Sequence, residues 1–464
     1  MNKRADIDPN KIIQVEDLSE PLIYSVEAFT SPEYAQDERD RLWSQVWQHA
    51  GRVEEIPEVG NFITYDIMDE SIVIVRSGPE TLKAFYNVCS HRGRQLVDVP
   101  EGAHSACGRK QNFVCGFHGW TYNLEGKCTR ILDKEDWKGI LNDERTKLNE
   151  IKVDTWGGWI WINMNPDCEP LLEYLLPASD LLSQFEFEKM RYHWRQWVVF
   201  DCNWKTALEA FMEPYHVEGT HPQLCVYGDF YAWSKAQGLH GHDGFDSKNP
   251  EENTSAATTT VTRAGKGPDA RKTIAQMQDD FWETIRGSTT PTLVNAAKRL
   301  VDELPEGTPA HEVHEHWYES AKRDDAARGV IWPTIDPDKL AKAGLAWHIF
   351  PNMSFIPGLT FLLGYRTRPY GNDPNKCIFE AYALERYPEG GEPKAPWVYA
   401  EPTEEKWRKV LAQDFSNMAA VQKGMRNRGF RGALPNPHQE QKITNFHRNL
   451  ARYMGRGSPE LIEK

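Results

Sequence analysis

Two pairs of cysteine and histidine residues constrain the fold of this chain more than any other feature. Cys89 and His91 form a Cys-x-His pair, and after 23 intervening residues Cys115 and His118 form a Cys-x-x-His pair. Thiolate and imidazole are preferred ligands of zinc and iron, so these side chains predict a four-coordinate metal site. The alternative is that they are four core residues of an unrelated domain.

The order of the ligands bears on which metal group they hold. Zinc fingers more often pair cysteine with cysteine and histidine with histidine. Here each pair mixes the two types, among β-type runs at 61–67, 71–77 and 82–88. A [2Fe–2S] cluster with both cysteines on one iron and both histidines on the other suits this pattern. A structural zinc protein is the rival interpretation.

The residues beside these ligands resemble the Rieske family. Its pattern is Cys-x-His-Arg-Gly followed by Cys-x-x-His-Gly-Trp, and four further positions match it: Arg92, Gly93, Gly119 and Trp120. The resemblance implies that the two cysteines and two histidines bind a Rieske [2Fe–2S] cluster. Neutral imidazole ligands leave such a cluster less negative, which raises its reduction potential.

A second candidate metal site lies in the segment NWKTALEAFMEPYHVEGTHP. His216 and His221 are five residues apart, or roughly 140° around a helix. They converge on one ion only if the helix bulges or ends between them, and Gly219 is a residue at which it can end. Glu213 shares a helix face with His216. Taken alone, such a histidine pair is more often structural.

Beside a Rieske-like domain, this segment resembles the catalytic signature of Rieske non-haem iron aromatic-ring-hydroxylating oxygenase alpha subunits. The resemblance implies that His216 and His221 are ligands of a mononuclear Fe(II) in a two-histidine, one-carboxylate triad. The later segment QDFSN matches the family's Q-D-x-x-N pattern and points to Asp414 as the carboxylate. Asp229 and Asp243 are alternatives that lack this context.

Two positions depart from the usual family pattern. Glu213 stands where most members have an aspartate, which bridges a neighbouring subunit's cluster to the iron. Glutamate is one methylene longer, so its carboxylate has to be directed differently to make the same hydrogen bonds. Ala210 replaces an asparagine found in many ring dioxygenases. Some members with glutamate hydroxylate amines, so amine hydroxylation is an alternative to ring dihydroxylation. The predicted substrate-binding residues flank the ligands: Ala210, Phe211 and Val217.

The expected architecture is an α+β fold. The resemblance implies a small all-β Rieske domain joined to a helix-grip catalytic domain with an antiparallel sheet. We expect an N-terminal helical segment over 1–45 that packs on the catalytic domain, the Rieske domain over 46–165 and the catalytic domain over 166–464. Residues 225–345 match no family segment that we can place, and we expect them to form the lid and entrance of the active site.

The implied function is that of the terminal oxygenase component of a multicomponent system. Electrons come from NAD(P)H through a flavin-dependent reductase, with or without a ferredoxin, to a head-to-tail trimer, α3 or α3β3 with a small β subunit. The predicted reaction is hydroxylation of an aromatic or related organic substrate with O2. The alternatives are hydroxylation or N- or O-dealkylation of a non-aromatic or amine substrate, and a non-catalytic Rieske electron carrier.

Composition excludes several other classes of function. With 54 Lys and Arg against 68 Asp and Glu, the net charge of −14 gives no global reason to bind nucleic acid or anionic lipid. The chain has no long apolar run or signal-like start, and its eight cysteines are scattered. We therefore expect a cytoplasmic protein.

Two weaker patterns lie in the second half of the chain. The polar stretch 241–272 predicts a mobile loop, with His240 and His242 exposed near its start. The run HEVHEH at 311–316 lacks the spacing of a zinc site and predicts a solvated helix face.

Overall fold

The computed structural model describes residues 18–227, 231–245 and 269–462. The chain divides into two compact units: a β unit of residues 36–174, and an α+β unit that joins the chain up to Ala35 to the chain from Leu175 onward. We expected boundaries at 45/46 and 165/166. Residues 36–45 and 166–174 lie in the β unit, whereas residues 18–35 of the expected N-terminal segment lie in the α+β unit.

The β unit contains two antiparallel sheets. The larger follows the order β2-β11-β10-β5-β4-β3-β6 and the smaller β7-β8-β9. The strands are β2 (Gln48–Arg52), β3 (Asn61–Ile67), β4 (Glu70–Gly78), β5 (Thr81–Tyr86), β6 (Cys107–Arg109), β7 (Phe113–Val114), β8 (Thr121–Tyr122), β9 (Cys128–Arg130), β10 (Glu150–Trp156) and β11 (Trp159–Asn163). The strands predicted from runs of β-branched and aromatic residues are present as β3, β4 and β5.

The α+β unit is built on one eight-stranded sheet in the order β13-β14-β15-β16-β17-β18-β12-β19. Its strands are β12 (Arg191–Phe200), β13 (Ala232–Gln237), β14 (His240–Phe245), β15 (Ala346–Ile349), β16 (Met353–Pro357), β17 (Phe361–Tyr370), β18 (Asp373–Glu385) and β19 (Val398–Tyr399). Arg366 and Glu380 are direct cross-strand neighbours and form a buried bidentate ion pair at 2.5 and 2.7 Å. Such a pair fixes the register of β17 against β18, because a slip would leave both charges buried and unpaired.

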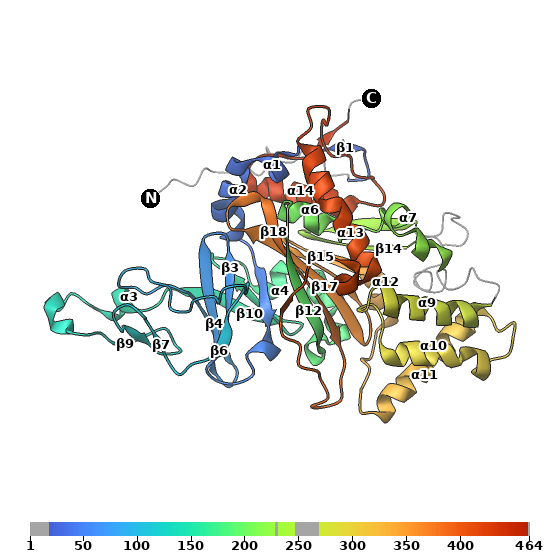
Figure 1. Cartoon of the computed structure of the whole chain (residues 1–464), viewed down its shortest axis with the longest axis horizontal. Helices are drawn as coiled ribbons and strands as arrows, with labels where there is room; N and C mark the ends of the chain where they lie inside the picture. Colours follow the sequence, from blue (N-terminus) through green and yellow to red (C-terminus); the bar gives the residue numbers. More distant parts are fainter. Residues whose placement is uncertain (1–17, 228–230, 246–268, 463–464) are drawn as a thin grey trace. The chain divides into compact units, whose positions relative to one another are not determined.

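Four helices position the candidate site. These are α6 (Trp204–Glu209), α7 (Val217–Thr220), α13 (Glu404–Met425) and α14 (Gln441–Met454). Helix α6 packs on β17 and β18, α14 packs on β13 and β14, and α13 packs on α6. Figure 1 shows α13 running across the sheet beside α6 and α7. Two chain segments that are almost 200 residues apart in sequence are therefore brought together over the sheet.

A separate group of helices occupies much of the segment that matched no family pattern. They are α9 (Ala270–Thr284), α10 (Pro291–Glu303) and α11 (Ala310–Ala327), and α12 (Pro337–Ala343) follows them. Figure 1 shows the first three packed together in yellow. Leu293, Leu300 and Trp317 belong to their shared apolar core. This group is a small helical subdomain.

The prediction of a loop over 241–272 is wrong at both ends of that range. Residues 240–245 form β14, and α9 begins at Ala270. His240 and His242 are buried, not exposed. The two glycines that suggested a loop are needed for packing, because a Cβ at Gly241 would meet Lys442 and one at Gly244 would meet the Trp233 ring. The part of the prediction over 246–268 lies outside the described residues.

The HEVHEH run lies on α11, where the solvated-face prediction holds for only part of it. His311 is exposed, but His314 packs on Trp317 and Tyr318. Burial lowers the pKa of His314 to about 4, so it is neutral at pH 7. Across residues 18–227, 231–245 and 269–462, no helix has both the length and the apolar character needed to cross a bilayer.

Candidate metal centres

His216 and His221 lie at the two ends of a single helical turn. Helix α7 covers only Val217–Thr220, so one histidine precedes it and the other follows it. The backbone leaves the helical region at His221, with φ −122° and ψ 53°. The helix therefore ends between the histidines, as their spacing requires, and the two ring centroids lie 5.3 Å apart.

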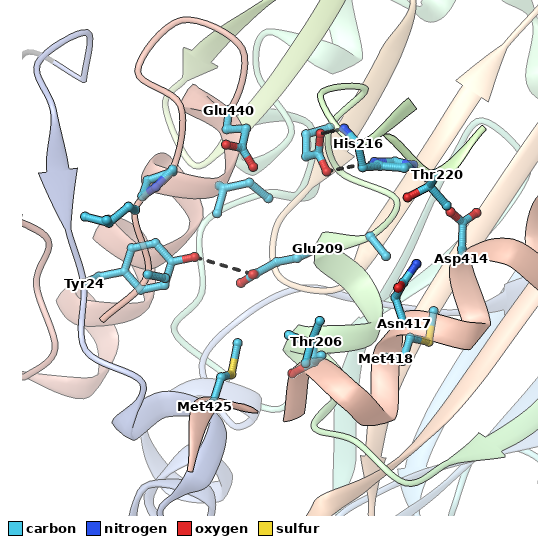
Figure 2. Close-up of a pocket in the computed structure, with 17 residues that line it drawn as sticks. Tyr24, Thr206, Glu209, His216, Thr220, Asp414, Asn417, Met418, Met425 and Glu440 are labelled. Carbon is cyan, nitrogen blue, oxygen red and sulfur yellow. Dashed lines mark hydrogen bonds and ion pairs between the residues drawn. The ribbon is translucent and has the colours of Figure 1, made fainter. Parts of the chain in front are cut away.

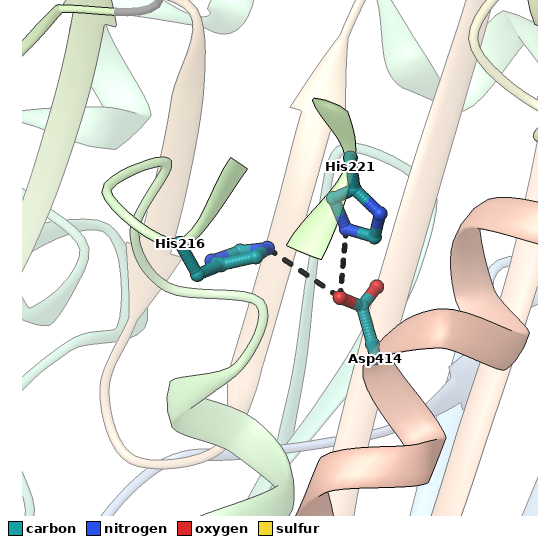
Figure 3. Close-up of side chains that lie close together, drawn as sticks. All are labelled: His216, His221 and Asp414. Atoms are coloured by element: carbon teal, nitrogen blue, oxygen red, sulfur yellow. Dashed lines mark hydrogen bonds and ion pairs between the residues drawn. The ribbon is translucent and has the colours of Figure 1, made fainter. Parts of the chain in front are cut away.

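Asp414 completes a group of three ligand-type side chains. Its Oδ1 lies 2.8 Å from Nε2 of His221 and 3.4 Å from Nε2 of His216. One ligand atom from each of the three residues lies within 4.8 Å of the others. Figure 3 shows both rings directed at the carboxylate, which α13 presents. Two imidazoles and one carboxylate are the donor set of a non-haem iron(II) facial triad, so the residues fit that ion.

The other two carboxylates considered for this role are placed differently. Asp243 lies on β14, where it is buried and forms an ion pair with Lys442. Burial raises the pKa of Asp243, and the charge of Lys442 opposes that rise. Its charge is thus already compensated by Lys442. Asp229 lies outside the described residues.

The electrostatics of the triad favour a bound cation. Burial acts to lower the pKa of His216, but its hydrogen bonds to Asp414 and Glu213 outweigh burial and raise that pKa to about 10. The two carboxylates therefore stabilise a positive charge between them. A divalent ion at Nε2 would supply that charge in place of the proton.

Glu213 holds His216 from the other side of its ring. Its Oε1 lies 2.8 Å from Nδ1 of His216, and its Oε2 accepts a 3.0 Å hydrogen bond from the His216 backbone N–H. When Nδ1 carries the proton, Nε2 is left free as a ligand atom. Glu213 thus orients His216 toward the triad.

The Cys–His pairs of the β unit lie on two similar loops. In each loop the glycine N–H donates to the cysteine carbonyl, from Gly93 to Cys89 and from Gly119 to Cys115, both at 3.0 Å. The two glycines have φ of +77° and +69°, a conformation that favours glycine. This explains why each motif carries glycine at that position.

The side chains of these loops meet in two pairs, histidine with histidine and cysteine with cysteine. The Nδ1 atoms of His91 and His118 are 3.2 Å apart, and His91 stacks on Trp120 at 5.0 Å. The thiols of Cys89 and Cys115 interact, and both are buried. Burial acts to raise the pKa of Cys115, but backbone N–H groups of residues 117 and 118 lower it overall. Two interacting, buried thiols and two neighbouring imidazoles are the donor set of a Rieske [2Fe–2S] cluster, so the residue types fit that group.

A cavity of about 340 Å³ opens beside the iron-type triad. Figure 2 shows Tyr24 on one side of it and Asp414 and Asn417 on the other. Four carboxylates line it, those of Glu209, Glu213, Asp414 and Glu440. No lysine or arginine is among its lining residues in the described part of the chain. Burial, reinforced by the nearby Glu213 and Glu209 charges, raises the pKa of Glu440 to about 7.

The three predicted substrate-binding residues are placed in different surroundings. Ala210 lines the cavity. Phe211 belongs instead to an aromatic cluster with Tyr365 and Phe379, at centroid distances of 4.3 and 5.0 Å. Val217 packs in an apolar cluster beside α7. Sequence reasoning missed Tyr24 and Glu440, because they lie far from the motifs and nothing near them in the sequence marks a site.

Two family models match the chain. The model described as "Ring hydroxylating alpha subunit (catalytic domain)" matches residues 186–456, which is more than half of the chain. The model described as "Rieske [2Fe-2S] domain" matches residues 46–139.

Individual relatives match over shorter segments. The oxygenase subunit of glycine betaine monooxygenase from Chromohalobacter salexigens is 29% identical over 187 residues, covering 40% of each chain. The alpha subunit of 2-aminobenzenesulfonate 2,3-dioxygenase from an Alcaligenes species is 30% identical over 190 residues, covering 40% of this chain and 46% of that one. The aligned segments thus span less than half of these relatives' length.

Among solved structures, a quaternary ammonium Rieske monooxygenase in complex with gamma-butyrobetaine matches with a TM-score of 0.62. It is 18% identical, and the match covers 94% of this chain and 97% of that one. At this identity the likeness concerns the fold alone.

Proposed function

The chain belongs to the family of ring-hydroxylating alpha subunits that carry a Rieske [2Fe–2S] domain, and on that premise we propose that it is the terminal oxygenase of a multicomponent system. The observation that carries the proposal is the convergence of His216, His221 and Asp414 on one point beside a cavity. We assign these three residues to mononuclear iron, and the two Cys–His pairs to the cluster. The iron supplies O2 activation and the cluster supplies electrons.

We further propose that electrons reach the chain from NAD(P)H through a flavin-dependent reductase, with or without a ferredoxin. The protein would work as a trimer in which the cluster of one subunit serves the iron of the next. Glu213 is the proposed bridge, because its carboxylate already contacts Nδ1 of His216. We expect this system in the cytoplasm, where NAD(P)H is available.

For the substrate, we propose an organic cation, most simply an amine or quaternary ammonium compound, rather than an uncharged aromatic ring. The four carboxylates of the cavity, with no lysine or arginine among its described lining residues, support this choice. The glycine betaine monooxygenase relative supports it as well. Hydroxylation of a carbon next to nitrogen places one oxygen atom of O2 in a C–H bond. The second oxygen atom takes up two electrons and two protons and leaves as water. The C–N bond of the hydroxylated product then breaks to give an amine and an aldehyde.

Iron and acid-labile sulfide, measured per chain on anaerobically purified protein, test the proposed function. We expect about three iron atoms and about two sulfides, because the two sites are built from separate residues. About two irons per chain, with no uptake of added Fe(II), would mean that only the cluster is present. The protein would then be an electron carrier rather than an oxygenase. Zinc without sulfide would contradict both sites.

The proposed substrate class predicts a pH dependence that resides in Glu440. Because the pKa of Glu440 is about 7, its carboxylate gains charge as the pH rises from 6 to 8. We expect a quaternary ammonium ligand to bind more tightly over that range. Glu440→Gln should weaken binding by roughly 3- to 10-fold at pH 8 and have little effect at pH 6. Calorimetric titration with choline and tetramethylammonium, quaternary ammonium probes that carry no carboxylate, checks this.

The control for this prediction is Glu460→Gln, which removes an exposed carboxylate of the same unit. It should leave binding unchanged at both pH values. Equal affinities for parent and Glu440→Gln at pH 8 would contradict the role of Glu440.

A further inference from the structure

The two histidines of the iron-type triad have chemically different partners on their far sides. Nδ1 of His216 faces the charged carboxylate of Glu213, whereas Nδ1 of His221 lies 2.9 Å from Oε1 of Gln413, a neutral amide. His221 is almost fully buried, so water does not offer Nδ1 an alternative partner. The Gln413 carbonyl is thus placed to accept the Nδ1 proton of His221.

Gln413 is itself held by a second glutamine. Nε2 of Gln223 donates to Oε1 of Gln413 at 2.7 Å, and Nε2 of Gln413 faces Oε1 of Gln223 at 3.4 Å. The two amides pair face to face, and Gln223 directs the carbonyl end of Gln413 toward His221. If both amides turned around, an N–H group would face Nδ1, and the His221 proton would move to Nε2. That tautomer has no lone pair to offer a metal.

The positions of these residues in the fold explain what the pair connects. Gln413 immediately precedes Asp414 on α13, and Gln223 follows His221 by two residues. Asp414 therefore supplies the carboxylate ligand, and the residue just before it supplies the acceptor for His221. The amide pair ties the segment that carries His221 to the helix that carries Asp414, on the side of the ring away from the triad.

We infer that Gln413, oriented by Gln223, is a positioning residue that fixes the Nδ1–H tautomer and the ring orientation of His221. This rests on the proposed function, since it concerns the iron site. A partner of this kind typically changes metal affinity by 10- to 100-fold when it is removed. It also gives a role to the glutamine of the QDFSN segment.

The test uses the full-length protein with its cluster intact, from which mononuclear iron has been removed with a chelator. Fe(II) alone is added back anaerobically, and its affinity is measured against a competing chelator. Gln413→Leu, which keeps the size but loses the acceptor, should bind Fe(II) about 10- to 100-fold more weakly. Gln413→Glu, which keeps an acceptor oxygen, should stay within about threefold of the parent. The EPR spectrum of the site after addition of nitric oxide gives a second readout, which should change in Gln413→Leu and not in Gln413→Glu.

The controls separate this inference from the proposed function. If the parent takes up no third iron, the proposed function fails. If the parent binds Fe(II) and Gln413→Leu binds it equally well with the parent's spectrum, the inference is overturned. If Gln413→Leu does not fold, Gln223→Leu decides: we expect about 3- to 10-fold weaker binding, and parent affinity would overturn the inference. Ser416→Ala, an exposed change on the same helix, should bind as the parent does.

Discussion

Replacing Asp414 with alanine should reduce turnover by at least about 1,000-fold and remove mononuclear iron while leaving the cluster in place. Asp414 is the one negatively charged member of the triad, and its Oδ1 lies within 3.4 Å of both histidine Nε2 atoms. Without the Asp414 carboxylate, only two neutral imidazoles remain as ligands. We expect them to bind iron(II) too weakly to hold it, because the charged oxygen ligand has been lost. Iron analysis should fall from about three to about two atoms per chain, with visible absorption of the cluster unchanged.

Two further variants make this result specific. Asp414→Asn keeps the shape of the side chain but removes its charge, and we expect a similar loss of iron because the amide is a weaker ligand. Asp279→Ala removes a half-exposed carboxylate from α9 and should behave as the parent does. Activity that persists in Asp414→Ala would show that the third ligand has been assigned wrongly.

Local geometry follows from sequence spacing where the motif residues are close together in the chain. Cys89 and His91 share one tight loop, and His216 and His221 flank one helical turn. In such cases spacing and backbone conformation fix where the side chains go. The helix end between the histidines was required by their angular separation and is present at His221.

The rest of the site depends on contacts that sequence spacing does not encode. Tyr24 and Glu440 meet at the cavity only because distant parts of the α+β unit fold against each other. The pairing of Gln223 with Gln413 joins residues 190 positions apart. These side chains carry no local signal, since a lone glutamine or glutamate is most often a solvated surface residue.

The misread strand β14 shows a second limit. Its composition of glycine, histidine and aspartate is typical of a turn, yet every residue of the strand is buried. Lys442 and Trp233 occupy the space that side chains at Gly241 and Gly244 would fill, and Asp243 is neutralised by Lys442. Tertiary packing thus overrides local preference here, and the deciding partner, Lys442, lies 200 residues later.

Glu213→Gln should lower turnover by roughly 10- to 100-fold while both iron sites stay occupied. The glutamine can still accept a hydrogen bond from Nδ1 of His216, so we expect the ligand to keep its orientation. What is lost is the negative charge beside the Nδ1–H group of His216, which Glu213 now places 2.8 Å from that nitrogen. If Glu213 also bridges to a histidine of the neighbouring cluster, the amide can accept from only one of the two rings, and electron delivery slows.

The comparison that isolates this effect uses protein with a pre-reduced cluster. Mixed with substrate and O2, the parent should lose the reduced-cluster absorption rapidly in a single turnover, and Glu213→Gln should do so 10- to 100-fold more slowly. Glu213→Asp keeps the charge but shortens the reach by a methylene, so it should recover part of the rate. Glu218→Gln, an exposed change in the same segment, is the control. Slow turnover with a normal rate of cluster oxidation would place the role of Glu213 in substrate binding instead, because its carboxylate also lines the cavity.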